Sequence, residues 1–340
     1  MSISIIKLTS SHYHEYEKFL LKFNDSLLYS SINYKLLLED YLNCESEYLL
    51  AMKEGKILGA LPLMIKNGQH GKVINSLPFY GSNGGVITAN SDAQIALLGA
   101  YKELASNSDN LCSCYINSPF KGKIEGFSYD YLDSRIGQIT PLCEDDSEGI
   151  KLMESFHYKT RNMVRKSQKQ ELSLKIENSS FDFLYQVHKE NMDAIGGKAK
   201  KLEFFKLIPK YFNAETDYNI LLAYKNNKPI AALLLFMHNQ TVEYFTPVIK
   251  QEFRNIQPMS FLIFEGMKKF QNRGYKYWNW GGTWESQEGV YRFKSRWNAI
   301  DYKYDYYISV SNKDILELSS DTLLKEYEGF YTVPFSILKN

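Results

Sequence analysis

The sequence predicts two mixed α/β domains, each with a largely antiparallel sheet flanked by helices. Three observations indicate this fold class. At 340 residues, the chain is longer than a single hydrophobic core usually fills. Its composition, 44% hydrophobic and 23% charged, is typical of a folded globular protein. Segments with strand-like and helix-like periodicity also follow one another in the same order twice along the chain.

The first half opens with a short predicted strand, ISIIKL, and a helix, SSHYHEYEKFLLKF, for which Ser10 or Ser11 is a suitable N-cap. Two apolar runs joined by KEGK form the predicted hairpin EYLLAMKEGKILGALPLMIKNG. The strand in VINSLPFYGSNGGVI breaks at Pro78 and runs into a glycine-rich turn. A helix at about 91–106 and a strand near CSCYI follow. We interpret the acidic turn CEDDSEG, residues 143–149, as a hinge between the domains.

The second half repeats this plan. Helical patterns in IKLMESFHYKTRNMVRKSQKQ, FDFLYQVHKENM and LEFFKLIPKYF precede a three-strand meander, YNILLAYKNNKPIAALLLFMHNQTVEYFTPVI. The helix PMSFLIFEGMKKFQNRG has Pro258 in its first turn and Gly274 as its stop, and the strand YKYWNW follows it. The hairpins YLLAMKEGKILGALPLMI and NILLAYKNNKPIAALLLF are so alike that internal duplication is the simplest account. We expect domains at 1–147 and 148–311.

Composition argues against several classes of protein. The net charge of +1 gives no overall attraction to nucleic acid or acidic membranes. The N-terminus lacks the features of a secretory signal, and the longest apolar run, IAALLLFM, is far too short to span a bilayer, so we expect a cytoplasmic protein without an integral membrane segment. Four cysteines without zinc-ligand spacing and six unclustered histidines predict that there is no metal site.

Three segments together resemble the FemAB-like branch of the GNAT acyltransferase superfamily: KTRNMVRKSQKQ, FRNIQPMSFLIFEGMKKFQNRGYKYWNWGGT and GVYRFKSRW. The resemblance implies tandem GNAT-like domains, with residues 312–340 packing back on the first. It also implies transfer of an acyl or aminoacyl group to an amino group. GNAT enzymes that bind coenzyme A carry small residues in a Gln/Arg-x-x-Gly-x-Gly/Ala turn. The corresponding residues here, 254–259, contain neither, although Arg254, Asn255 and Met259 remain the candidate cofactor-binding positions.

The segment YWNWGGTWESQEGVYRFKSRWNA, residues 277–299, combines a glycine pair with cations and large aromatics. Acyl transfer needs a group that stabilises the oxyanion of the tetrahedral intermediate. Lys294, flanked by Phe293 and Trp297, matches the lysine that FemAB-like enzymes place near the reacting carbonyl. The alternative is a surface lysine on a strand that extends its charge into water. We predict that this segment forms the floor of an acyl-transfer site, with substrate contacts from Trp280, Gly282 and Arg292.

The proton-transfer groups are harder to assign. Glu243, in the predicted strand TVEYFTPV, lies where GNAT enzymes often hold a carboxylate, and we take it as the candidate general base. Tyr291 either relays a proton or packs, and its spacing does not decide between these roles. His188 and Asp193 are weaker candidates for the base.

Two further segments are candidate substrate-binding sites. Arg161, Arg165 and Lys169 have the spacing of one helical face, and Lys159 precedes them, so the helix either binds an anion or presents a solvated basic face that pairs with the acidic turn. In SLPFYGSNGG, Phe79 and Tyr80 are placed to stack on a sugar or base, and the resemblance puts an acceptor pocket nearby. A simple strand-ending turn is the alternative.

The leading hypothesis is an N-acyltransferase that uses acetyl-coenzyme A or another acyl-CoA. Its acceptor is the amino group of a nucleotide- or lipid-linked amino sugar in cell-surface polysaccharide synthesis. The second hypothesis keeps the fold but takes aminoacyl-tRNA as the donor for a peptidoglycan or glycan precursor. A third is a non-catalytic module that binds a glycan precursor, which the absence of a clear general base allows.

Overall fold

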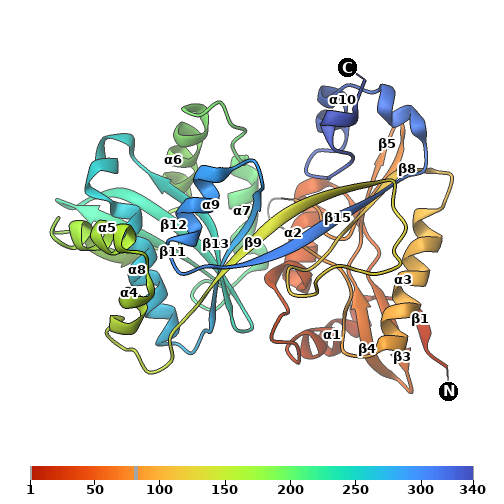
Figure 1. The fold of residues 1–340 in the computed structure, drawn as a ribbon, viewed down its shortest axis with the longest axis horizontal. Helices are drawn as coiled ribbons and strands as arrows, with labels where there is room; N and C mark the ends of the chain where they lie inside the picture. The colour runs from red at the N-terminus through yellow and green to blue at the C-terminus, as the bar shows by residue number, and fades with distance from the viewer. Residues whose placement is uncertain (1, 80–82, 340) are drawn as a thin grey trace. The chain divides into compact units, whose positions relative to one another are not determined.

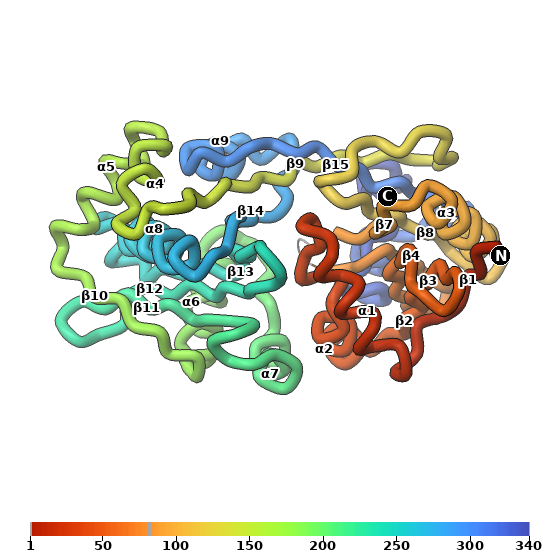
Figure 2. The backbone as a smooth tube through the Cα atoms, turned by 90° about the horizontal axis from the view of Figure 1, so that it is seen from below, coloured from red at the N-terminus to blue at the C-terminus, as the bar shows by residue number. Residues whose placement is uncertain are grey.

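The computed structural model describes residues 2–79 and 83–339 (Figure 1). Its contacts divide the chain into two compact units: unit 1 consists of residues 1–136 and 302–340, and unit 2 of residues 137–301. The chain enters unit 2 along β9 (Tyr131–Pro141) and leaves it along β15 (Ile300–Val310). These two strands are neighbours in the sheet, as Figures 1 and 2 show. The expected boundaries near 147 and 311 lie further along the chain, because each unit takes part of both strands.

Unit 1 contains a four-stranded sheet with the order β1-β3-β4-β7. Its strands are β1 (Ser4–Lys7), β3 (Leu49–Lys53), β4 (Lys56–Leu61) and β7 (Ile87–Thr88). A second set of paired strands has the order β15-β8-β6-β5-β2. Its strands besides β15 are β2 (Glu45–Ser46), β5 (Met64–Gly68), β6 (Gly71–Asn75) and β8 (Asn110–Ile116). The helices are α1 (Tyr13–Leu20), α2 (Ile32–Leu42), α3 (Ser91–Ala105) and α10 (Ser320–Glu326), with 3-10 turns at Ser10–His12, Leu28–Ser30, Lys313–Glu317 and Phe335–Ile337.

Helix α3 covers the four-stranded sheet. Asn90 caps its N-terminus, because the side-chain oxygen accepts a hydrogen bond from the Ala93 N–H at 2.9 Å. Ala93, Leu97 and Tyr101 follow one another at helical spacing and are buried in one cluster with Leu49 of β3 and other apolar residues. The C-terminal segment belongs to the same unit: Ile315, Leu323, Tyr327 and Val333 are buried in a cluster that includes Val73, Leu111, Cys112 and Cys114.

Unit 2 is built on a sheet with the order β10-β11-β12-β13-β14-β9. Its further strands are β10 (Ser173–Ile176), β11 (Tyr218–Lys225), β12 (Lys228–His238), β13 (Thr241–Ile249) and β14 (Tyr277–Trp284). The helices are α4 (Ile150–Ser155), α5 (Tyr158–Gln168), α6 (Phe181–Asp193), α7 (Leu202–Tyr211), α8 (Pro258–Gln271) and α9 (Glu288–Ser295), with a 3-10 turn at Gln251–Ile256.

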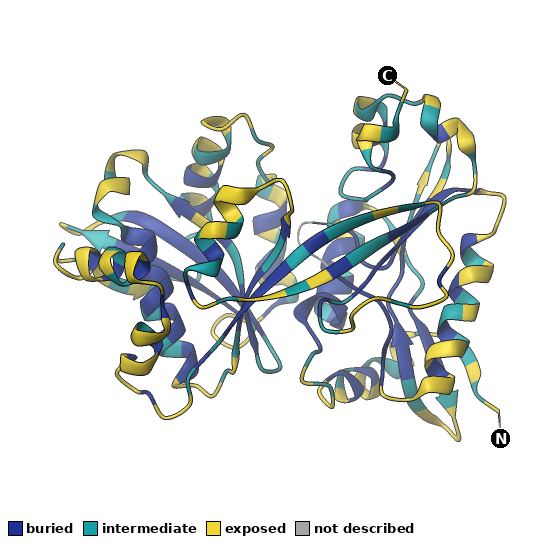
Figure 3. Ribbon diagram, in the orientation of Figure 1, coloured by how far each residue is buried: buried dark blue, intermediate teal, exposed yellow. Residues whose placement is uncertain are grey.

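The sheet of unit 2 is covered on both faces. On one face, Leu152 of α4, Val164 of α5 and Leu262 of α8 pack in the same cluster as Leu233 and Leu235 of β12. On the other face, the ring of Phe245 in β13 lies 5.7 Å from Phe204 of α7 and 4.9 Å from Phe236 of β12. Strands β11 and β12 are therefore buried along most of their length, whereas the outer side of α5 is exposed (Figure 3). The predicted fold class is confirmed.

The two hairpins share one geometry. In unit 1, β3 and β4 are joined by Glu54 and Gly55, and in unit 2 the hairpin β11–β12 turns at Asn226 and Asn227; all four residues have positive φ. Both hairpins close on a pair of lysines and carry a register shift at the same distance from the turn, after Ala51 in one and after Ala223 in the other. A shared bulge of this kind is the structural counterpart of the sequence repeat.

The acidic turn at 143–149 belongs to unit 2 rather than to a hinge. The Asp146 carboxylate accepts hydrogen bonds from the N–H groups of Ile150, Lys151 and Leu152, which begin helix α4. Burial alone would raise the pKa of Asp146, but these backbone bonds and one from Gln271 outweigh it and lower the pKa. Because Gln271 is in α8, the turn is fastened to the core of unit 2.

Candidate functional site

The candidate site begins where two strands of unit 2 part. Strands β13 and β14 are parallel and pair only over Thr241↔Tyr277, Val242↔Trp278 and Glu243↔Asn279. Both strands continue well beyond this point. A register shift in the pairing of β12 with β13 follows immediately, leaving Phe245 as an extra residue between two paired positions. The ladder therefore ends in a polar pair, Glu243 and Asn279, both of which are buried.

A chain of hydrogen bonds leads from Glu243 to Lys294. The Asn279 side-chain NH₂ donates to the Glu243 carboxylate at 2.8 Å, and its oxygen accepts from the Gly281 N–H at 2.9 Å. The Gly281 carbonyl in turn accepts from the Lys294 ammonium at 3.3 Å. The structure thus brings together the predicted base and the predicted oxyanion stabiliser through two intervening residues. Asn279 was absent from the sequence prediction.

Lys294 is a buried cation whose hydrogen bonds go to neutral groups. It is only 6% exposed, and its ammonium also donates to the Gly282 carbonyl at 3.2 Å and to the Thr283 hydroxyl at 2.7 Å. Among the ion pairs of the described residues, none includes Lys294. Burial lowers its pKa to about 8. The ammonium is therefore mostly charged at neutral pH.

The local structure around Lys294 differs from the prediction. The glycine pair lies within strand β14 rather than after it, and Gly281 has φ of 71°, a value that favours glycine. Lys294 lies on helix α9 and is buried, so the alternative of a surface lysine on a strand is wrong. Glu288 in the first turn and Arg292 and Lys294 in the last turn complement the helix dipole, which helps to explain why this charged segment is helical.

The aromatic residues of this segment fix the inner face of α9. Trp297 is fully buried, and its ring lies 5.0 Å from Phe156 and 5.9 Å from Trp280. Phe293 completes the cluster, 5.9 Å from Trp280. These contacts hold the helix so that Lys294 faces the Gly281–Thr283 segment of β14. Trp280, predicted to contact substrate, is 3% exposed and instead forms part of this support.

Tyr291 and Arg292 lie on α9 with Lys294, but neither side chain bonds to its ammonium. Arg292 is exposed and pairs with Glu288 at 3.6 Å. The Tyr291 hydroxyl donates to Asp301 at 2.7 Å, and this hydrogen bond raises its pKa. Both residues line a shallow surface hollow formed by His157, Glu288, Tyr291, Arg292, Ser295 and Arg296. Gln138 links Tyr291 to the Lys294 bonds, because its NH₂ group donates to the Tyr291 carbonyl at 3.4 Å and its oxygen accepts from the Thr283 hydroxyl at 3.5 Å. Arg292 takes no part in these bonds and stays at the surface.

The basic residues at 159–169 lie on α5 and at its end. Lys159 and Arg165 are exposed, as a solvated basic face would be. Arg161 is half-buried and donates to the main-chain oxygens of Phe156 and Glu154, at 2.5 and 3.2 Å. Arg161 therefore satisfies carbonyls near the end of α4, which gives it a structural role. The predicted pairing of this face with the acidic turn is not among the ion pairs of the described residues.

The start of α8 corresponds to the coenzyme A turn of GNAT enzymes. Gln257 has φ of 61° and is followed by Pro258 as the first helical residue, so this position offers no N–H group. Met259 is buried, whereas Arg254 and Asn255 are exposed on the preceding 3-10 turn. Two of the three candidate cofactor-binding residues can thus reach a ligand from this turn.

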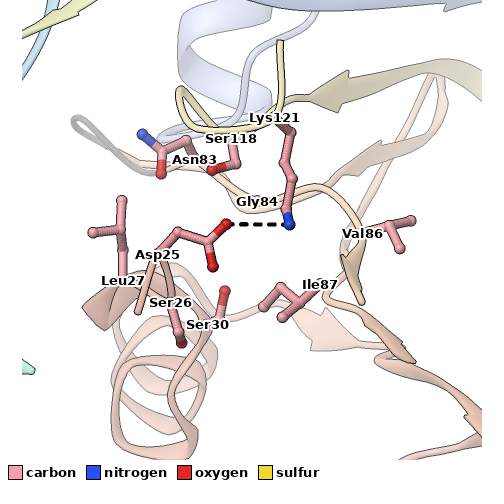
Figure 4. A pocket seen from close by; sticks show the side chains of 10 residues that line it. All are labelled: Asp25, Ser26, Leu27, Ser30, Asn83, Gly84, Val86, Ile87, Ser118 and Lys121. Carbon is pink, nitrogen blue, oxygen red and sulfur yellow. Dashed lines mark ion pairs between the residues drawn. The ribbon is translucent and has the colours of Figure 1, made fainter. Parts of the chain in front are cut away.

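The predicted acceptor segment lies in unit 1. Tyr80 is outside the described residues. Phe79 is half-buried: its N–H donates to the Gly329 carbonyl at 2.7 Å, and its ring lies 5.2 Å from Tyr41. Further along the segment, Asn83 and Gly84 line a pocket with Asp25 and Lys121, which form an ion pair at 3.1 Å (Figure 4). Its volume of about 10 Å³ is room for a single water molecule.

Two weaker candidates for the base have other roles. His188 is buried, and its Nε2 accepts the Lys200 N–H at 3.1 Å. Burial, with a contribution from the Lys200 charge, lowers its pKa to about 4. Asp193 is exposed and pairs with Lys189 at 2.5 Å. Among the described residues, no group of three His, Cys, Asp or Glu could hold a metal ion. None of the helices in the described part of the chain is long and apolar enough to cross a membrane.

Two histidines of unit 2, one buried and one partly buried, predict acid sensitivity. Burial lowers the pKa of His238 to about 4, as it does that of His188. Both are expected to stay neutral in the folded state and to bind protons in the unfolded state below pH 6.5, so stability is complete above pH 6.5 and falls as the pH approaches 4. At pH 5 each histidine should cost about 1–2 kcal/mol.

Urea denaturation of the full chain at pH 7.5 and 5.0 measures this loss. Replacing His238 with phenylalanine should reduce the difference between the two pH values, whereas replacing the exposed His14 with glutamine should leave it unchanged. An equal difference in the wild type and the His238→Phe variant would contradict the prediction for that histidine.

Comparisons with known proteins show which family and which solved structures the chain resembles. Residues 219–304 match the model of the FemAB family. This segment contains the whole network from Glu243 to Lys294. The structure also superposes on the crystal structure of FemX with a TM-score of 0.70 and 16% sequence identity, covering 89% of this chain and 97% of that chain. The chain is similar to the FemAB family in this segment and to FemX in its fold. The resemblance inferred from the sequence is confirmed.

Two other solved structures support the fold of the FemAB-like chain. A tandem GNAT protein from the clavulanic acid biosynthesis pathway has a TM-score of 0.54 and 8% identity, covering 92% of this chain and 99% of that chain. A conserved protein of unknown function from Bacteroides thetaiotaomicron has a TM-score of 0.59 and 12% identity, covering 91% and 99%. A search of curated protein sequences found no significant match. The family match and the fold together support a transferase.

Proposed function

We propose that this FemAB-like chain transfers an acyl group to the amino group of a cell-surface glycan or peptidoglycan precursor. The observation that carries this proposal is the buried Lys294 ammonium, linked by hydrogen bonds through Gly281 and Asn279 to the Glu243 carboxylate. Acyl transfer is accelerated by a donor that stabilises the oxyanion and by a base that accepts the amine proton, and the network provides one candidate for each.

The transfer proceeds in two steps. The neutral amine attacks the acyl carbonyl carbon, a C–N bond forms, and the carbonyl oxygen becomes an oxyanion that accepts a hydrogen bond from Lys294. The amine proton passes to Glu243, directly or through water; the oxyanion then collapses, the bond from the acyl carbon to the donor oxygen or sulfur breaks, and the donor leaves as the alcohol or thiol when it takes the proton from Glu243 or from water. Glu243 is 1% exposed, so the bound substrate must replace the groups that cover it.

Two donor classes fit this chemistry: the thioester of acetyl-CoA or another acyl-CoA, and the ester of an aminoacyl-tRNA. The start of α8 favours the ester. Pro258 removes one N–H group from the turn at which GNAT enzymes bind the coenzyme A pyrophosphate, and no small residue opens it. The basic face of α5, with Lys159 and Arg165 exposed, suits a polyanionic donor. The acceptor is a nucleotide-linked or lipid-linked precursor with a free amino group.

Donor competition tests the proposal. Purified protein is incubated with a mixture of precursors carrying amino groups and either acetyl-CoA or a set of aminoacyl-tRNAs, and amide products are identified by mass spectrometry. Product from aminoacyl-tRNA alone is the expected result, with activity that falls steeply as salt increases. Product from acetyl-CoA alone would overturn the donor assignment and leave acyl transfer standing. Binding of precursor without product from either donor would favour the non-catalytic module.

A further inference from the structure

The side chain of Asn279 makes two different hydrogen bonds at the end of the β13–β14 ladder. Its NH₂ group donates to Glu243 at 2.8 Å, and its oxygen accepts from the Gly281 N–H at 2.9 Å. A carboxylate can only accept and a backbone N–H can only donate, so this amide orientation is the one that satisfies both partners. Aspartate at this position has no donor for Glu243, and alanine has neither group.

The hydrogen bond from the Gly281 N–H to Asn279 also affects the backbone conformation of β14. It closes a short turn two residues along the chain, which bends β14 at the point where Gly281 adopts φ of 71°. This conformation directs the Gly281 carbonyl to the Lys294 ammonium at 3.3 Å. The same side chain therefore holds the carboxylate on one side and the peptide that contacts the lysine on the other.

We infer that Asn279 is a positioning residue for the proposed transfer, which sets the Glu243 carboxylate and the Gly281–Lys294 contact in one fixed arrangement. This inference rests on the proposed function and deepens it. Asn279 is 2% exposed and in the interior of the sheet, so it acts through the two groups that it holds and does not need to touch the acyl donor.

Two substitutions separate its two bonds. Asn279→Ala removes both, and misplacement of catalytic groups by such a change is expected to lower kcat by about 10- to 100-fold with little change in KM. Asn279→Asp keeps the bond from Gly281 but places a second carboxyl group beside Glu243. Because two adjacent carboxylates do not both ionise readily, the acid limb of the pH–rate profile should move up by about one pH unit or more.

Asn219 provides a matched control in the same unit. It is also a fully buried asparagine of a central strand, but its NH₂ group donates only to the carbonyls of Glu215 and Tyr218, at 3.3 and 2.7 Å. Asn219→Ala should lower the melting temperature, as Asn279→Ala does, without altering the pH profile or kcat of the folded fraction. A purely structural role for Asn279 would make the two alanine variants behave alike.

The closing experiment combines kinetics with a measurement that needs no turnover. Rates are measured with whichever donor gives product, and the ¹³C resonance of the Glu243 carboxyl group, identified by its loss in Glu243→Gln, is followed against pH. The expected result is a titration at higher pH in Asn279→Asp and an unchanged one in Asn219→Ala. Unaltered kinetics and an unaltered Glu243 titration in both Asn279 variants would overturn the inference. Absence of product from the wild type would count against the proposed function, and the Glu243 titration would still decide whether Asn279 holds that carboxyl group.

Discussion

Replacing Lys294 with methionine is expected to lower kcat by about 100- to 1,000-fold while the affinity for the acceptor stays nearly unchanged. The side chain is buried, and methionine fills a similar space with an unbranched apolar chain. The substitution therefore removes the cation that would stabilise the oxyanion without opening a large cavity. Steady-state kinetics with the active donor, together with calorimetric titration of the acceptor, measure the two quantities separately.

The pH dependence of the reaction provides a second test of Lys294. Because its pKa is lowered to about 8, loss of the ammonium should reduce the rate above pH 8. Lys294→Arg retains a charge throughout this range and should lack that alkaline limb, even if its overall rate is lower. Lys276→Met, at a half-exposed lysine of the same unit, is the matched control and should not change kcat. Equal losses in the Lys276 and Lys294 variants would contradict a role for Lys294 in the chemistry.

Replacing Trp297 with alanine is expected to reduce the free energy of unfolding of unit 2 by about 3–5 kcal/mol. Trp297 is fully buried between Phe156, Trp280 and Phe293, so its removal leaves a cavity that these rings cannot close without shifting α9. Because α9 carries Lys294, transfer activity should fall in the fraction that remains folded. Urea denaturation followed by circular dichroism measures the stability change.

Trp284 provides the control for this substitution. It lies on the same segment but is 47% exposed, so Trp284→Ala should change stability by about 0.5 kcal/mol or less. Trp297→Phe, which keeps an aromatic ring in the cluster, should lose clearly less stability than Trp297→Ala. A loss of similar size at both tryptophans would show that the aromatic cluster does not support α9.

Much of the fold could be predicted from the sequence because its signals are local. Apolar runs, turn residues and helical periodicity lie within single segments, and the repeated hairpin is by itself enough to indicate the duplicated plan. The glycine pair was harder to place. Glycine marks a change in backbone direction but does not tell whether the strand ends there or bends and continues, and in β14 it bends at Gly281.

The candidate site was predictable only in part, because it depends on contacts between segments. Lys294 and Glu243 could be proposed from their segments and the family resemblance. Asn279 gave no signal beyond its position in the strand YWNW, since its role appears only when β13 and β14 are paired in register. Tyr291 and Arg292 were grouped with Lys294 by proximity in sequence. The helical turn of α9 instead puts Arg292, two residues before Lys294, on the opposite side, whereas Tyr291, three residues before it, stays on the side of Lys294.

The way the chain passes through β9 and β15 has a consequence for its synthesis on the ribosome. Unit 2 is encoded without interruption, whereas unit 1 is complete only when residues 302–340 have been made. Strand β8 pairs with β15, and the cluster around Val73 and Leu111 includes Tyr304 and Leu323. During translation, unit 2 can therefore reach its final structure first, while the earlier-made residues of unit 1 still lack a strand and part of their core. Residues 302–340, which are made after unit 2, thus complete a unit whose other residues are made before it.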